Sequence, residues 1–192
     1  MRSPSYLVAL ATLLLLVGCS RGDSAAPPSA PPAAKTGDYS PGLAVGEKAP
    51  AFELVDQSGQ KQSLANILKS GNVALVFYRS ADWCPFCRKH LVQLRNDIEK
   101  LNAAGVQVVG ISYDSLDVLK KISESMEIPF LLLSDEGSKT IHEYGLHSRD
   151  GLPHPGTLLI DQSGVIQAKL FNRGFRTRHT NDELVAAAEK LE

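Results

Sequence analysis

The stretch RSADWCPFCRKH, residues 79–90, sets two cysteines three positions apart with a proline directly after the first. It follows a continuous apolar run, VALVFY at 73–78, which is typical of a strand covered on both faces. Pro85 favours the first position of a helix, because it has no backbone N–H to leave unpaired there. Apolar residues then recur at helical spacing, at Leu91, Leu94, Ile98 and Leu101. We therefore predict a strand, a turn at the cysteines and a helix over 85–103.

Strands and helices alternate through the rest of the chain. We expect strands over 51–55, 106–112, 130–133, 157–161 and 165–171. We expect helices over 63–68 and 138–144, a helix capped by Asp114 that runs to residue 126, and a last helix opened by a capping box at 180–183. The tetrapeptide DQSG occurs at 56–59 and again at 161–164, and we interpret both copies as turns. This order predicts an α/β fold, a thioredoxin-like three-layer sandwich whose mixed central sheet is parallel first and antiparallel at its end.

The N-terminus is expected to lie outside this fold. Its apolar run at 7–17 is too short to span a bilayer and follows Arg2, which favours a signal peptide over 1–18. The sequence before Cys19 resembles a bacterial lipobox, in which the cysteine is lipidated. The alternative is a plain secretory peptide cut nearby. Residues 19–42 are rich in Ala, Pro and Ser and predict a tether, which leaves 43–192 as the folded domain.

Lipidation also explains the odd cysteine count. The chain has 3 cysteines, and an anchor at Cys19 leaves Cys84 and Cys87 as a pair. We therefore expect a membrane protein of the bacterial cell envelope that faces the periplasm, where disulfides persist. Ser20, after the lipidated position, resembles an outer-membrane sorting signal.

The overall charge excludes one class of partner. The net charge is −1, whereas nucleic acid binding needs a basic surface, so we expect no nucleic acid partner. A small arginine cluster near the C-terminus is interpreted as a solvated face; it consists of Arg173, Arg176 and Arg178.

Four segments in this order resemble the peroxiredoxin-like, or redoxin, branch of the thioredoxin superfamily, often named for alkyl hydroperoxide reductase and thiol-specific antioxidant. They are FYRSADWCPFC at 77–87, ISYD at 111–114, IPFLLLSD at 128–135 and LPHPGTLLID at 152–161. The resemblance covers roughly residues 43–190. One feature departs from it, because peroxiredoxins carry Pro-x-x-x-Thr/Ser-x-x-Cys. Counted back from Cys84, the hydroxyl and proline positions hold Ala81 and Phe77; counted back from Cys87, they hold Cys84 and Ser80.

Helix geometry and the thioredoxin resemblance together assign a role to each thiol. At the first turn of a helix, Cys84 would face unpaired backbone N–H groups and the positive end of the helix dipole, both of which favour a thiolate. We expect Cys84 to be exposed and to attack, and Cys87, one turn later, to be more buried and to resolve the intermediate as a redox disulfide. Val76 stands where thioredoxins place a buried acid, so the proton acceptor is left unnamed.

Two other interpretations of the pair stay open. A structural disulfide of such short span would remove little loop entropy from the unfolded chain, which argues against a staple. Zinc would be bound by Cys84, Cys87 and His90, but no further cysteine completes a typical site. Covalent haem needs a histidine where Arg88 stands. We expect no metal and no cofactor.

Further residues are expected to line the site. Trp83 would pack beside the sulfur and present an apolar wall to a partner, and Arg79 would favour the thiolate. Pro155 resembles the cis-proline that faces the dithiol in thioredoxins, with Pro153 as the alternative. His154 is either an acid/base group or simply exposed. The other histidines are expected at the surface or on helix faces, namely His90, His142, His147 and His179.

These expectations favour a lipid-anchored thiol–disulfide oxidoreductase with antioxidant character. Its substrates would be disulfide-bearing proteins or peroxides, and an envelope thiol would re-reduce it. The first alternative is a thiol-dependent peroxidase that reduces hydrogen peroxide or alkyl hydroperoxides. The second is a non-enzymatic lipoprotein in which the two cysteines bind metal or staple a turn.

Overall fold

The computed structural model describes residues 41–148, 152–172 and 174–191. The predicted signal peptide, the tether up to residue 40 and the lipidation site Cys19 lie outside the described residues. The lipid anchor therefore stays a prediction. Within the described ranges, none of the helices combines the length and the apolar character needed to cross a bilayer.

The described residues form strands and helices in nearly the predicted order. The strands are β1 (Glu53–Asp56), β2 (Lys61–Ser63), β3 (Asn72–Phe77), β4 (Val106–Ser112), β5 (Leu131–Ser134), β6 (Gly156–Ile160) and β7 (Ile166–Phe171). The helices are α1 (Leu64–Leu68), α2 (Pro85–Asn96), α3 (Ile98–Ala103), α4 (Leu116–Ser125), α5 (Lys139–Glu143) and α6 (Asn181–Ala188). Strand β2 was not predicted, because KQS carries no apolar run.

The strands form one mixed sheet in the order β2-β1-β5-β4-β3-β6-β7. Strands β3, β4 and β5 are parallel, whereas β6 and β7 pair antiparallel at one end, as the sequence predicts. Strand β1 also pairs antiparallel with β5, so the parallel part is the centre of the sheet and not its first part. Because β3 and β4 are parallel, the loops that follow them meet at one edge of the sheet.

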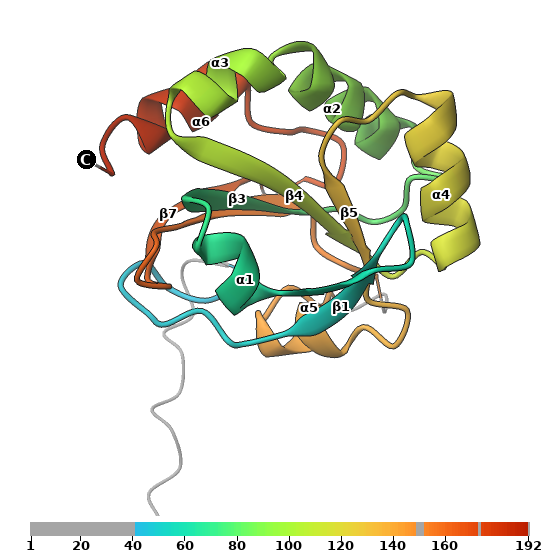
Figure 1. Ribbon diagram of the computed structural model, residues 1–192, viewed down its shortest axis with the longest axis horizontal. Coiled ribbons are helices and arrows are strands. Elements are labelled where there is room, and N and C mark those ends of the chain that lie inside the picture. The colour runs from blue at the N-terminus through green and yellow to red at the C-terminus, as the bar shows by residue number, and fades with distance from the viewer. Residues whose placement is uncertain (1–40, 149–151, 173, 192) are drawn as a thin grey trace, which may run out of the picture. The chain divides into compact units, whose positions relative to one another are not determined.

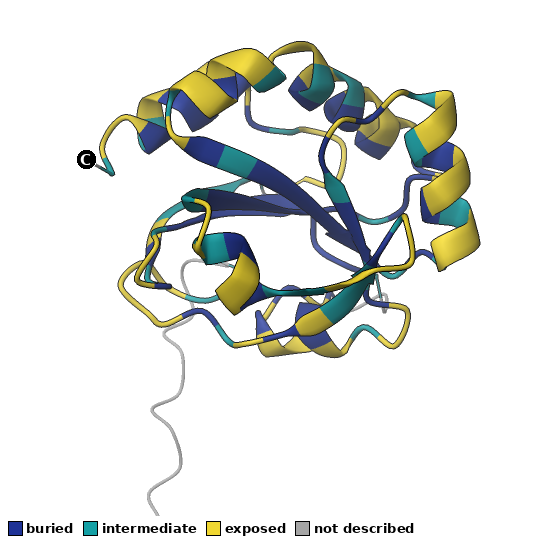
Figure 2. Ribbon diagram, in the orientation of Figure 1, coloured by how far each residue is buried: buried dark blue, intermediate teal, exposed yellow. Residues whose placement is uncertain are grey.

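Helices cover both faces of the sheet and make the predicted three layers. Helices α2, α3, α4 and α6 lie on one face, and α1 and α5 lie on the other (Figure 1). Side chains alternate along β3, so that Val76 faces the α2 side and Leu75 faces the α1 side. Figure 2 shows that the buried positions follow the sheet and the inner faces of the helices.

The helix predicted over 85–103 is divided in two at Asp97. There the backbone leaves helical geometry, with φ −108° and ψ 17°. Asn181 of α6 donates from Nδ2 to the Gln93 carbonyl at 2.9 Å and to the Asp97 carboxylate at 2.7 Å. Asn181 is a second donor to the Gln93 carbonyl, which also accepts from the Asp97 backbone N–H at 3.2 Å. The local sequence does not reveal this contact from a distant element.

We predict that the seating of α2 on the sheet depends on Leu91, which is fully buried on its inner face. Leu91→Ala removes buried apolar contacts and leaves a cavity, so it should lower the free energy of unfolding by about 2–5 kcal/mol. Urea unfolding followed by circular dichroism measures this. Gln93→Ala, at an exposed position of the same helix, is the matched control. An equal loss in both variants would contradict the packing described.

Candidate redox site

Asp114 fixes the loop that leads into the two cysteines. Its buried carboxylate accepts hydrogen bonds from Ser80 Oγ at 2.7 Å, from the Ala81 backbone N–H at 2.7 Å and from Ser112 Oγ at 2.9 Å. The prediction that Asp114 caps a helix is wrong: Ser115 is the N-cap of α4, and the Asp114 side chain turns across to the neighbouring loop. Sequence analysis missed this role, although the position just after a buried strand at the carboxyl edge of a parallel sheet signals it.

The two cysteines lie at the start of α2 as predicted. Cys84 is the N-cap residue, Pro85 opens the helix, and Cys84 Sγ accepts a hydrogen bond from the Cys87 backbone N–H at 3.3 Å. Both cysteines are free thiols. One helical turn separates them, so the two sulfurs are close neighbours.

The expected exposure and ionisation of Cys84 are wrong. Its side chain is only 3% exposed, and Cys87 is fully buried. Burial, followed by the neighbouring Cys87 sulfur, raises the pKa of the Cys84 thiol to about 11. The helix N-terminus opposes this rise through the hydrogen bond from the Cys87 N–H but does not overcome it. At neutral pH, Cys84 therefore keeps its proton.

Arg178 places a positive charge beside the other sulfur, that of Cys87. Its Nη2 donates to Cys87 Sγ at 3.3 Å, while Nη1 donates to the carbonyls of Phe175 and Thr177, both at 3.0 Å. The interpretation of Arg178 as part of a solvated cluster is wrong, since its guanidinium is partly buried against the dithiol. Its distance of 91 positions from Cys87 hides this contact from local sequence patterns.

Three exposed aromatic side chains close to the pair form an aromatic rim. Trp83 is 48% exposed, Phe86 41% and Phe175 36%. The Arg79 guanidinium lies between two of them, 5.2 Å from the Trp83 ring centre and 4.8 Å from that of Phe175. Trp83 Nε1 also donates to Tyr113 Oη at 2.8 Å, which fixes the indole at the rim. Arg79 thus contributes to a cation–π stack, and the roles beside the sulfur expected of Arg79 and Trp83 stay predictions.

The segment LPHPG lies beneath this rim and departs from two expectations. No peptide bond within the described residues is cis, so neither Pro155 nor Pro153 is the cis-proline that the thioredoxin resemblance suggested. His154 is fully buried and not exposed. Its Nδ1 lies 3.1 Å from the Pro155 carbonyl, and its ring packs against Phe171 and Phe175.

Two further histidines are buried, whereas a surface or helix-face position was predicted for them; His90 does lie on a face of helix α2, but on a buried one. His90 and His179 are 2% and 7% exposed, and their rings meet edge to face with centres 4.8 Å apart. Burial lowers the pKa of His90 to about 3 and lowers that of His179, so both rings are neutral at neutral pH. His142 and His147 are exposed and stack on each other at 3.7 Å.

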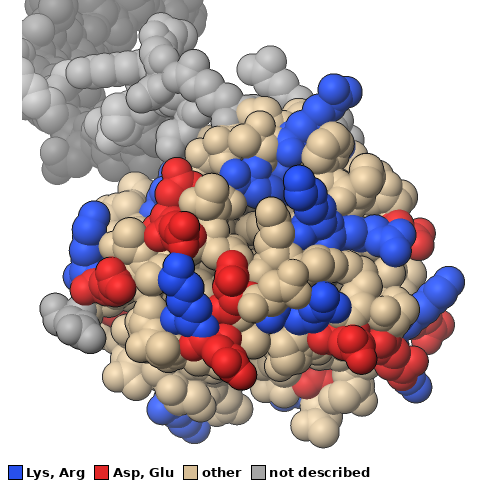
Figure 3. All heavy atoms as spheres, turned by 90° about the horizontal axis from the view of Figure 1, so that it is seen from above, with Lys and Arg blue, Asp and Glu red and all other residues tan. Residues whose placement is uncertain are grey.

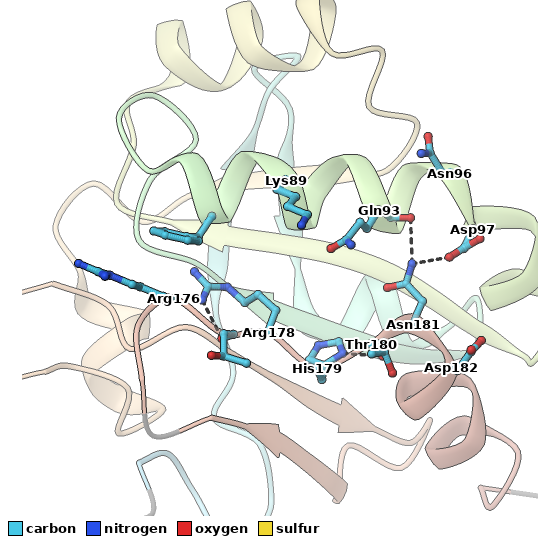
Figure 4. A pocket seen from close by; sticks show the side chains of 12 residues that line it. Lys89, Gln93, Asn96, Asp97, Arg176, Arg178, His179, Thr180, Asn181 and Asp182 are labelled. Carbon is cyan, nitrogen blue, oxygen red and sulfur yellow. Dashed lines mark hydrogen bonds between the residues drawn. The ribbon is translucent and has the colours of Figure 1, made fainter.

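A groove of about 660 Å³ runs beside the dithiol, between α2 and the segment at 176–182. Figure 4 shows Lys89 and Gln93 extending from α2 on one wall, with Arg178, His179 and Asn181 on the other. Figure 3 views the helical layer from above and shows basic side chains gathered on one part of that face. The groove and the dithiol share Arg178, so positive charge lies where the two meet.

The zinc interpretation finds no support in the geometry. Across the ranges that the structure describes, no group of three or more His, Cys, Asp or Glu side chains is placed to hold a metal ion. His90 in particular turns to His179.

A thioredoxin-like sheet with two free thiols at the strand-to-helix turn defines a thiol-based redox protein. Residues 45–169 match the model of the AhpC/TSA family. "Peroxiredoxin Q, chloroplastic" of Sedum lineare is 36% identical over 148 residues, covering 76% of this chain and 78% of that protein. The protein of the same name from Populus jackii is 34% identical, covering 76% and 68%. The crystal structure of peroxidoxin BcpB from Mycobacterium tuberculosis matches with a TM-score of 0.70 at 26% identity, covering 77% of this chain and 97% of that one.

The chain therefore belongs to the AhpC/TSA family, and its relatives are peroxiredoxins of the thioredoxin superfamily. This confirms the predicted fold and family, and it identifies the chain as an oxidoreductase of the antioxidant, peroxiredoxin-like class. The relatives contradict the predicted location in a bacterial envelope, because their names assign them to the chloroplast of plants.

We predict that Asp114→Asn loosens the loop before Cys84. The amide nitrogen cannot accept hydrogen bonds, so at least one buried donor among Ser80, Ala81 and Ser112 loses its partner. The free energy of unfolding should fall by about 1–3 kcal/mol. Chemical denaturation measures this, with Asp117→Asn, exposed in the first turn of α4, as the control. Equal stability of Asp114→Asn and the unaltered protein would show that the loop is held by other contacts.

Proposed function

We propose that the chain is a thiol-dependent peroxidase in which Cys84 and Cys87 form the redox pair. The observation that carries the proposal is the asymmetry of the two sulfurs. Both cysteines are buried, but the Arg178 guanidinium donates to Cys87, whereas burial and the neighbouring Cys87 sulfur raise the pKa of the Cys84 thiol. A guanidinium stabilises negative charge that develops on the sulfur it contacts, and the anionic sulfur is the reactive form of a cysteine.

This asymmetry reverses the roles expected from the sequence. In the proposed cycle, the Cys87 thiolate attacks the terminal oxygen of a hydroperoxide and breaks the O–O bond. Cys87 becomes a sulfenic acid, and the departing alkoxide takes the proton of Cys84 to leave as an alcohol, or as water from hydrogen peroxide. The Cys84 thiolate then attacks the Cys87 sulfur and expels hydroxide, which solvent protonates. The product is a Cys84–Cys87 disulfide. An external dithiol, or two thiols in succession, attacks it through a mixed disulfide, is itself oxidised to a disulfide and so returns both cysteines to thiols.

The spacing of residues before Cys87 supports the assignment of Cys87 as the attacking thiol and Cys84 as the resolving thiol. Counted back from Cys87, Cys84 stands at the hydroxyl position of the peroxiredoxin pattern. A thiol there can donate a hydrogen bond to the attacking sulfur, as a hydroxyl can. Its Sγ is already beside Cys87, because it accepts from the Cys87 backbone N–H.

Burial of the pair favours a small substrate. Neither sulfur is more than 3% exposed, so a compact hydroperoxide reaches the site more readily than a disulfide in a folded protein. The low-dielectric surroundings also strengthen the contact between Arg178 and an anionic sulfur.

The aromatic rim supports a second candidate function, thiol–disulfide exchange with a protein partner. Trp83, Phe86 and Phe175 form an exposed apolar surface at the mouth of the site, and such surfaces typically mark protein contacts. The same surface would receive the thiol protein that re-reduces the pair. The two candidates share the dithiol and differ in the substrate that it reduces, a hydroperoxide or a disulfide of a protein partner.

We predict that Cys84→Ser and Cys87→Ser differ in their first reaction with peroxide. Both should be measured in a Cys19→Ser background, which leaves no other thiol. Stopped-flow mixing with hydrogen peroxide should show fast oxidation of Cys84→Ser and slow, free-thiol-like oxidation of Cys87→Ser. Neither variant should form the internal disulfide. Fast oxidation confined to Cys87→Ser would restore the predicted attack by Cys84, and slow oxidation of the unaltered pair would exclude the peroxidase.

We also predict that Trp83→Ala weakens turnover with a protein reductant while sparing turnover with dithiothreitol. The indole belongs to the docking surface and does not contact either sulfur in a hydrogen bond. Steady-state peroxide consumption with each reductant should show a higher KM for the protein reductant alone. Val45→Ala, at another exposed apolar position, is the control. An unchanged KM for the protein reductant would remove the rim from the function.

A further inference from the structure

A short hydrogen bond joins β6 to the segment that carries Arg178. Thr157 on β6 is fully buried, and its Oγ1 lies 2.6 Å from Nε2 of His179. The two residues are 22 positions apart, and His179 directly follows Arg178. This hydrogen bond therefore connects the sheet to the residue next to Arg178, whose guanidinium contacts Cys87.

The second ring nitrogen fixes the direction of this hydrogen bond. His179 Nδ1 lies 3.0 Å from the Thr180 carbonyl, which can only accept, so Nδ1 carries the ring proton. The neutral ring then offers a lone pair at Nε2, and Thr157 Oγ1 donates to it. A valine at 157 would keep the shape of the side chain and lose this donor.

The position of the Arg178 guanidinium depends on the same hydrogen bond between Thr157 and His179. Both carbonyls that hold Arg178 Nη1 belong to Phe175 and Thr177, in the same segment, so they move with it. The His179 ring also packs nearly perpendicular to the ring of His90 on α2, with the ring centres 4.8 Å apart. The His179 ring is thus held between β6 and α2, and its position sets where the segment passes Cys87.

A buried hydroxyl–imidazole pair costs desolvation energy that an apolar pair of the same shape would not. The hydrogen bond between Thr157 and His179 therefore indicates a role besides packing. We propose that Thr157 and His179 are positioning residues, which act through Arg178 by holding its guanidinium against the Cys87 sulfur. The inference rests on the proposed function for its biological meaning, but its test reads the sulfur directly.

The test measures the thiolate of Cys87 by its ultraviolet absorbance as a function of pH. In the Cys19→Ser, Cys84→Ser background Cys87 is the only thiol, and the variant that also carries Cys87→Ser provides the baseline. Thr157→Val should move the midpoint upward by about one pH unit, a roughly ten-fold smaller thiolate fraction below the midpoint. Thr157→Ser, which keeps the hydroxyl, should leave the midpoint near that of the parent.

Coupling to Arg178 separates positioning from mere packing. In an Arg178→Met background, Thr157→Val should cause no additional shift, because the charge that it positions is gone. A Thr157→Val variant that loses stability but keeps the parental midpoint overturns the proposal, as does an equal shift with and without Arg178. Should Thr157→Val not fold, His179→Phe, which keeps a ring and removes both nitrogens, is measured in the same way with the same two outcomes.

These readings are independent of peroxidase activity. A shifted midpoint in a protein that fails to reduce peroxide would retain the positioning role and reject the proposed function. An unshifted midpoint in an active peroxidase would reject the positioning role and retain the proposed function.

Discussion

The contact between the Arg178 guanidinium and the buried Cys87 sulfur depends on elements from the whole domain and gives the site its chemistry. Asp114, at the end of β4, fixes the loop before the cysteines. The start of α2 places one sulfur at the N-cap and the other a turn later. The segment before α6 then brings the positive charge. Since these elements are far apart in the sequence, only the complete sheet assembles the site.

The two sulfurs are both buried, but their contacts make them unequal. In water, two neighbouring thiols would differ little, because solvent screens nearby charges and dipoles. Here burial raises the pKa of Cys84 to about 11, and a guanidinium contacts Cys87. One thiol thus retains a proton for a leaving group, while the charge beside the other favours the nucleophile. The proposed peroxidase chemistry follows from this division of roles.

The sequence predicted the fold well because local patterns specify it. The apolar run at 73–78 and Pro85 located β3 and the start of α2, and the capping box at 180–183 located α6. The long-range part of the site was missed. The role of Arg178, the burial of His90 and His179, and the contact of Asn181 with Asp97 each involve elements distant in sequence. The burial of Cys84 was also missed. A helix start can be recognised in the sequence, but the desolvation that raises the pKa of this thiol comes from the packed domain.

The most direct test of this account is the chemical state of the pair after one turnover. The Cys19→Ser protein, fully reduced and then given one equivalent of hydrogen peroxide without a reductant, should be digested and mapped by mass spectrometry. We expect a single product, the intramolecular Cys84–Cys87 disulfide. Recovery of both residues as thiols, or of an over-oxidised cysteine with no disulfide, would contradict it.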